Sequence, residues 1–319
     1  MRPWVNSAAI ILLLCLLPVN PAGSFQAQKE SGSGIIVQYG PPRELSLLKD
    51  ERIDESSGIA ASIRYPGAFW THNDSGDSAR VFLIDKSGKT LATVSIKGAS
   101  AVDWEDIASF KLGKESYVLI ADAGDNVRRR ETCVLYVVRE PEIDIYSGVE
   151  EPSSIEAEPV LQISFSYEDG PHDCEAVAVD PTTSIIYLVS KEPGESRVYC
   201  MPFPTKESKD PNVAKAVATL NMQFPTAMDI SPDGKRAVIL TYVDAYEFSR
   251  VGEEAWAQAF SREPRLIKAP ARKQGESICY GPDGRTLYLT SEKEHQPLWE
   301  IPVVEGAKNH KIPASEGSQ

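Results

Sequence analysis

The sequence has few of the residues that usually hold transition metals or act as nucleophiles. It contains five cysteines and four histidines in 319 residues, and no two cysteines form a C-x-x-C pair, so a zinc site is not expected. The patterns G-x-S-x-G, H-E-x-x-H, G-x-x-x-x-G-K-[ST] and G-x-G-x-x-G do not occur. Nucleophilic catalysis and the common nucleotide-binding loops therefore have no support from motifs.

Positive charge is also scarce. Lysine and arginine number 33 against 46 acidic residues, which gives a formal net charge of −13. The one basic run is Arg128-Arg129-Arg130. Because binding to phosphate backbones or anionic lipids needs clustered Lys and Arg, we expect neither a nucleic-acid polymer nor a membrane surface as a partner.

A long apolar run is absent after the first 25 residues. Before that point Arg2 precedes an apolar stretch from Ala8 to Leu17, which is followed by Pro18 and several small residues. This order is typical of a secretory signal and is too short to span a bilayer. The sequence predicts a signal peptide over residues 1–25, a single domain over residues 26–319, a secreted or periplasmic location and a monomer. Four cysteines remain in that domain, and they are compatible with buried thiols or with disulfides.

Five similar segments repeat along the chain. Each places an oxygen-bearing side chain just before a short β-type run that ends in a turn. The oxygen-bearing residues are Ser57, Glu105, Glu175, Thr226 and Glu276. The steps between them are 48, 70, 51 and 50 residues, close to the length of a four-stranded propeller blade.

The repeats predict an all-β, five-bladed β-propeller. Second strands rich in aromatic and β-branched residues follow each turn, for example at residues 237–241. The last repeat ends after three strands, so we expect residues 43–48 to supply its outer strand and close the ring. The long second step carries a Pro- and Glu-rich insertion at residues 140–159, interpreted as a surface excursion, with a hidden sixth blade as the alternative. Helical character is predicted at residues 252–260.

In such a fold the repeat starts and the loops after the second strands lie on one face. Three carboxylates and two hydroxyls would then converge, and like charges so close together disfavour ionisation unless a cation is present. An oxygen-only set suits a hard ion, so the sequence predicts Ca²⁺ held by the five repeat-start residues. A solvated pore lined by carboxylates remains the alternative.

The loops on this face supply the candidate chemistry. Carboxylates could position a water, hold a second metal or bind sugar hydroxyls, and cations could bind a phosphate. The candidate catalytic residues are His72, Asp74, Asp77, Asp122 and Asp125. The candidate ligand-binding residues are Asn73, Asn126, Arg128, Lys191, Glu192 and Lys293. Asp and Asn also build tight loops, so an architectural role is equally open.

The order Ser, Glu, Glu, Thr, Glu at the repeat starts resembles the axial calcium ring of the calcium-activated nucleotidases (apyrases). The run Glu55-Ser56-Ser57-Gly58-Ile59 is similar to their first blade. The same run, followed by Asn73-Asp74 and by residues 103–108, also resembles the SdiA-regulated and esterase-like phytase-type propellers. Both resemblances imply a β-propeller, and the first implies five blades, calcium and hydrolysis of phosphoanhydrides.

Two classes of function follow. One is a calcium-dependent hydrolase of phosphorylated or phosphoanhydride small molecules. The other is a non-catalytic propeller that binds a small molecule, glycan or protein on the same face and has a structural calcium. A glycan-active enzyme is a further possibility, because paired carboxylates also serve that chemistry.

Overall fold

The computed structural model describes residues 37–145 and 151–304, and these residues form an all-β fold. The predicted signal peptide, residues 1–25, lies outside the described residues. In the described part of the chain, no helix has the length and apolar character needed to cross a bilayer.

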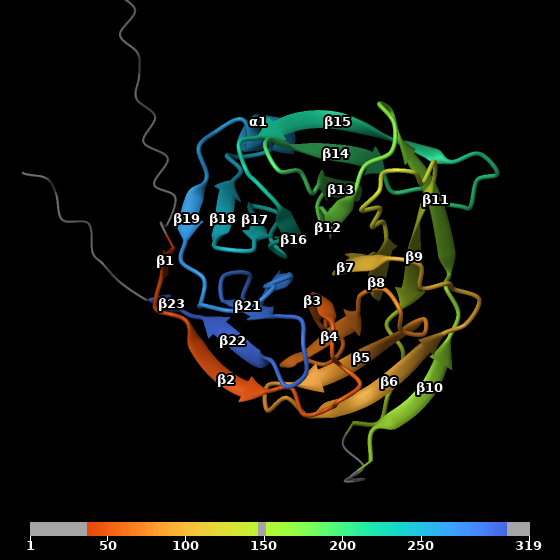
Figure 1. The fold of residues 1–319 in the computed structure, drawn as a ribbon, viewed down its shortest axis with the longest axis vertical. Coiled ribbons are helices and arrows are strands. Elements are labelled where there is room, and N and C mark those ends of the chain that lie inside the picture. The colour runs from red at the N-terminus through yellow and green to blue at the C-terminus, as the bar shows by residue number, and fades with distance from the viewer. Residues whose placement is uncertain (1–36, 146–150, 305–319) are drawn as a thin grey trace, which may run out of the picture. The chain divides into compact units, whose positions relative to one another are not determined.

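Most strands form antiparallel groups of four in chain order, as the repeats predicted (Figure 1). The first sheet contains β3 (Ser56–Ala61), β4 (Ala68–Asn73), β5 (Arg80–Asp85), β6 (Thr90–Ile96) and, at its edge, β10 (Ser153–Ala157). A second four-stranded sheet contains β16 (Pro225–Ile230), β17 (Arg236–Thr241), β18 (Ala245–Ser249) and β19 (Arg265–Ile267). The predicted helical segment is confirmed as α1 (Trp256–Phe260), which lies between β18 and β19.

The largest sheet has eight strands. Its first half is β7 (Trp104–Leu112), β8 (Glu115–Asp122), β9 (Cys133–Arg139) and β11 (Leu161–Tyr167). Its second half is β12 (Cys174–Val179), β13 (Ile185–Ser190), β14 (Ser196–Pro202) and β15 (Asn212–Leu220). The outer strands β11 and β15 pair in parallel over three residues, and the end strands β7 and β12 lie against each other. The sheet therefore nearly closes on itself, like a barrel.

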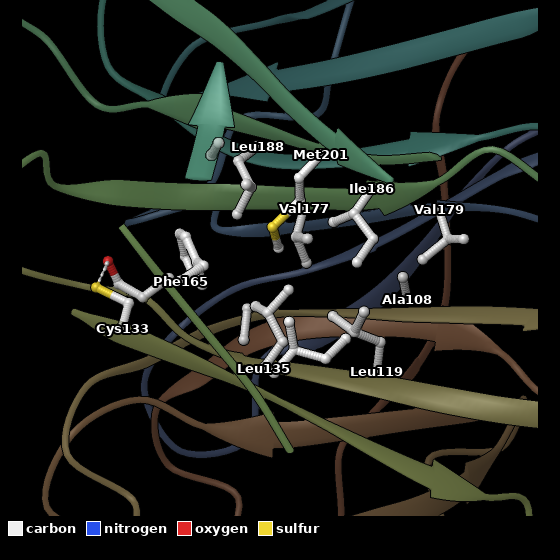
Figure 2. Packing of buried hydrophobic residues seen from close by; sticks show 14 of the residues in the cluster. Ala108, Leu119, Cys133, Leu135, Phe165, Val177, Val179, Ile186, Leu188 and Met201 are labelled. Carbon is white, nitrogen blue, oxygen red and sulfur yellow. Dashed lines mark hydrogen bonds between the residues drawn. The ribbon is translucent and has the colours of Figure 1, made fainter. Parts of the chain in front are cut away.

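The core between the two halves of this sheet is apolar. Leu119 and Leu135 of the first half face Ile186 and Leu188 of the second, with Phe165 beside them (Figure 2). All five are at most 1% exposed. Burying a side chain of this size contributes about 1.5 to 3 kcal/mol, so this interface is a main source of stability.

The N-terminal strand closes the last sheet, as predicted. β2 (Arg43–Leu47) pairs with β22 (Pro297–Ile301), the third strand after β20 (Ser277–Tyr280) and β21 (Leu287–Thr290). β1 (Gln38–Tyr39) and β23 (Val303–Val304) add a short ladder. This pairing covers an edge that would otherwise expose unpaired N–H and C=O groups.

The insertion at residues 140–159 is more than a surface excursion. Its β10 pairs in parallel with β6 over five residues. Its first residue, Glu140, is 1% exposed and accepts hydrogen bonds from Ser62 Oγ and from Trp70 Nε1 at 2.7 Å. The interpretation as a surface excursion was wrong for β10 and Glu140. Composition alone does not show that the edge of β6 needs a partner strand or that the buried donors of Ser62 and Trp70 need an acceptor.

The five innermost strands gather together. β3, β7, β12, β16 and β20 each lie against the next, and β20 lies against β3 (Figure 1). This arrangement brings the starts of the five repeats to one end of the strands.

Candidate functional site

The repeat-start residues occupy β-bulges. The pairing register of the first and second strands shifts at Ser57, Glu105, Glu175 and Thr226. A bulged residue is left out of the ladder and can turn its side chain away from the sheet face. Glu276 directly precedes β20 and so also lies outside the regular ladder. In four of the five repeats, a bulge therefore lets the repeat-start side chain point in a different direction from the side chains next to it.

Five carboxylates meet at this end. The carboxylate oxygens of Asp74, Asp103 and Glu105 lie within 4.8 Å of one another, and so do those of Glu105, Asp173 and Glu175. Glu105 belongs to both groups and is 2% exposed. We call these five residues the acidic cluster.

The electrostatics of the acidic cluster are unfavourable for the protein alone. Burial, and then the neighbouring Glu175, raise the pKa of Glu105 well above its usual value. Burial also raises the pKa of Glu175 to about 8 and that of Asp74 to about 6. Oε2 of Glu175 is buried and has no hydrogen-bond partner among the described residues. A bound cation would relieve both the repulsion and the missing partner.

The donor set fits a hard cation. All the groups are carboxylates, the ligands that Ca²⁺ and Mg²⁺ prefer over the nitrogen and sulfur ligands typical of zinc. Gly124 lies against the cluster, since a Cβ on it would stand 2.1 Å from Oε1 of Glu105 and 2.6 Å from Oδ2 of Asp103. The acidic cluster thus needs a residue without a side chain at this position.

The predicted ring is only partly the one observed. Glu105 and Glu175 belong to the acidic cluster, whereas Glu276 does not. Burial and the adjacent Glu292 raise the pKa of Glu276 to about 9. The two hydroxyls connect neighbouring inner strands instead: Ser57 Oγ donates to the carbonyl of Glu105 at 2.7 Å, and Thr226 Oγ1 donates to that of Gly275 at 2.9 Å.

Lys191 forms an ion pair with a member of the acidic cluster. Its Nζ donates to Oε1 of Glu175 and lies 5.2 Å from the centre of the Tyr242 ring. The Lys191 and Glu175 side chains are 15% and 2% exposed, so this is a largely buried ion pair. Ligand binding by Lys191 stays a prediction, and its charge already neutralises one carboxylate of the cluster.

Three of the predicted catalytic aspartates build the loops. Asp122 accepts the N–H groups of Val102 and Asp103 and pairs with Arg130 at 2.7 Å. Asp125 accepts the N–H of Arg130 at 2.6 Å and is 4% exposed.

Asp77 has a similar role in its own loop. It accepts the N–H of Ser78 at 2.6 Å and the side-chain amide of Asn73 at 3.0 Å, and it pairs with Arg80 at 2.8 Å. These partners leave Asp77, Asp122 and Asp125 little capacity to bind a substrate or a second metal. Of the predicted loop aspartates, Asp74 alone is in the acidic cluster.

His72 is a core residue. It is 0% exposed, packs edge-on against Trp104 with ring centres 5.7 Å apart, and shares a 2.9 Å hydrogen bond with the carbonyl of Asn73. Burial lowers its pKa to about 4, so the ring is neutral at pH 7. A catalytic role for His72 stays a prediction, and the structure places the ring in the core. Asn73 is also buried and donates to the carbonyl of Arg52 at 2.6 Å.

The remaining predicted residues lie at the rim. Arg128 pairs with Glu192, and the Arg128 side chain is 45% exposed. Lys293 Nζ lies 3.6 Å from Glu292 and 3.8 Å from Glu55 and is 51% exposed. Asn126 is exposed. These groups remain accessible to a ligand approaching the acidic cluster.

Asp103 and Asp173 were not among the metal ligands predicted from the sequence. A signal was present, because an acidic residue stands two positions before the repeat start in Asp103-Trp104-Glu105 and in Asp173-Cys174-Glu175. In a strand, residues two apart lie on the same face. The bulges at Glu105 and Glu175 break this alternation, so sequence spacing alone does not show that Asp103 and Asp173 lie beside them.

The comparisons with known proteins add no relative. No protein-family model matches the chain, and no curated protein matches it. The argument about function therefore rests on the geometry and electrostatics of this chain.

Proposed function

We propose that the protein is a five-bladed β-propeller that holds Ca²⁺ in the acidic cluster and hydrolyses phosphorylated or phosphoanhydride small molecules at that end. The closed succession of contacts among β3, β7, β12, β16 and β20 supports five blades. The pairing of β2 with β22 supports closure by the N-terminal strand.

The convergence of five carboxylates carries the calcium proposal. Asp74, Asp103, Glu105, Asp173 and Glu175 would hold the ion, and water or main-chain carbonyls could complete the six to eight ligands that Ca²⁺ takes. Glu175 is paired with Lys191. The other four carboxylates of the acidic cluster form no ion pair with a described residue. The bound ion would supply positive charge for an anionic ligand.

A phosphorylated ligand is favoured by the charges around the cluster. Arg128 and Lys293 lie at the rim with exposed side chains, and calcium would make the centre of this end less negative. Asp74 lies in the loop after β4, and its side chain, like that of Asp103, is half-buried. We assign Asp74 the role of orienting the attacking water. The resemblance to the calcium-activated nucleotidases points to the same class of reaction.

A turnover panel tests this function. Nucleoside di- and triphosphates and simple phosphate esters are incubated with the purified protein, with calcium or with chelator, and released phosphate is measured. We expect calcium-dependent release that falls about 100-fold in Asp74→Asn. Asp210→Asn, an exposed aspartate outside the cluster, is the matched control and should keep full activity. No turnover on any substrate would reject the hydrolase.

A second candidate is a non-catalytic propeller with the same calcium. It is favoured by the loop hydrogen bonds of Asp77, Asp122 and Asp125, which leave the site with few free groups for proton transfer. Under this alternative the same phosphorylated compounds would bind in a calcium-dependent way without being hydrolysed. Calorimetry on the panel distinguishes the two functions.

A further inference from the structure

A cavity lies where the innermost strands end, away from the acidic cluster. Its volume is about 370 Å³, and residues at or near the ends of all five strands line it. These include Ala61 of β3, Phe110 of β7, Val179 of β12, Ile230 of β16 and Tyr280 of β20. No residue of the acidic cluster lines this cavity, so it is a separate site.

Prolines surround the cavity. Pro66, Pro181, Pro232 and Pro282 follow four of the five innermost strands and line it, and Lys111 of β7 stands at the fifth position. Proline has a fixed φ angle and no N–H group, so these walls are rigid and have no donors from those residues. A preformed apolar cavity is the usual form of a small-molecule site, because little entropy is lost when its walls are already ordered.

One carboxylate lies among these apolar walls. Asp229 accepts the N–H of Ile230 through Oδ1 and the N–H of Tyr280 through Oδ2, both at 2.8 Å. Asp229 forms no ion pair with any described residue, including the exposed Lys111. Burial raises the pKa of Asp229 to about 7, because the ionised carboxylate loses hydration and has no counter-charge in contact.

The cavity contains one further polar group without a partner. Ser109 lines the cavity, and its buried hydroxyl has no hydrogen-bond partner among the described residues. A ligand with several N–H donors would satisfy the remaining lone pairs of Asp229 and could also reach the serine oxygen. An ammonium group combines three donors with the positive charge that the site lacks.

We propose that this cavity binds a small organic ammonium compound, whose apolar part packs against Phe110, Tyr280 and the prolines while its ammonium group donates to Asp229. The proposal is independent of calcium and of the proposed hydrolase activity.

Benzylamine is the probe, and two compounds of nearly the same shape, benzyl alcohol and benzoate, are its controls. Binding to the full chain is measured by calorimetry or ligand-observed NMR at about pH 8, where the Asp229 carboxylate is mostly ionised. We expect benzylamine to bind at least about tenfold more tightly than benzyl alcohol, and benzoate not to bind, because hydrogen bonds to charged groups are the stronger kind.

Three variants locate the site. Asp229→Asn should weaken benzylamine binding about tenfold or more. Ser109→Leu fills the cavity without touching Asp229 and should weaken it as well. Asp74→Asn, which alters the acidic cluster at the other end, should leave benzylamine binding unchanged, so failure of this proposal and failure of the proposed function are distinguishable.

Several results would overturn the proposal. These are no binding of benzylamine, equal binding of the alcohol, or unchanged binding in both Asp229→Asn and Ser109→Leu. If Asp229→Asn does not fold, Ser109→Leu and the comparison of the three probes decide the question.

Discussion

The acidic cluster at the strand starts and the interior of the innermost strands surround carboxylates in opposite ways. At the starts, bulges aim Glu105 and Glu175 at each other, and their repulsion is relieved only in part by Lys191. Within the strands, Asp106 is also buried, but three backbone N–H groups donate to it. Asp106 accepts the N–H groups of Val177 and Met228, which connects β7 to β12 and β16.

These surroundings predict different behaviour. A buried carboxylate whose oxygens accept three backbone N–H bonds, as in Asp106, holds strands together without a bound cation. Carboxylates that face one another without enough donors destabilise the fold unless something binds to them. The following predictions test whether the two groups behave so differently.

Glu105→Gln should have the largest effect. Glu105 is shared by both carboxylate groups, so its loss should abolish most calcium binding. At a calcium concentration 1,000 times Kd, binding stabilises the native protein by about 4 kcal/mol, and this gain should disappear. The difference in Tm between calcium and chelator measures it. Glu253→Gln, an exposed residue with the same change in charge, should keep the full difference.

Lys191→Met should lower the stability of the protein in chelator by about 3 kcal/mol or more, because it leaves a buried glutamate without its cation. Calcium should restore much of this loss, so the calcium response should be larger than in the native protein. Lys293→Met at the exposed rim is the control and should change stability by less than about 1 kcal/mol. Denaturant unfolding with and without calcium provides the comparison, and an equal loss in both conditions would contradict it.

Asp106→Asn should cost about 1 to 3 kcal/mol, because one of its oxygens becomes an amide that faces backbone donors. The loss should be the same with calcium and with chelator. A calcium-dependent loss in this variant would erase the distinction between the two kinds of carboxylate.

Stability without metal should also depend on pH. Burial raises the folded-state pKa of Glu175 to about 8 and that of Asp74 to about 6, above their unfolded values. The folded protein then binds more protons than the unfolded chain, so stability without metal should fall as pH rises from about 4.5 to about 8. We expect Tm in chelator to fall by about 2 °C or more over this range and calcium to reduce the fall. Equal slopes in both conditions would argue against a shared cation.

Much of the fold could be predicted because strands and turns are local. The repeat starts, the turns that contain Pro and Gly, and the runs of β-branched residues placed the innermost strands correctly. The need to cover an edge predicted the pairing of β2 with β22. The role of Glu140 was not visible, because its partners Ser62 and Trp70 are some seventy residues away in the chain.

For the site, the sequence by itself determined that an oxygen-bearing side chain recurs at one position per repeat, and this brought Glu105 and Glu175 into the candidate set. Only the tertiary structure decided which acidic residues meet: it added Asp173, placed Glu276 beside Glu292, and turned Ser57 and Thr226 to main-chain carbonyls. The physical reason is that periodicity fixes which residues are equivalent, whereas bulges and contacts between strands fix where each side chain points and which charge it faces.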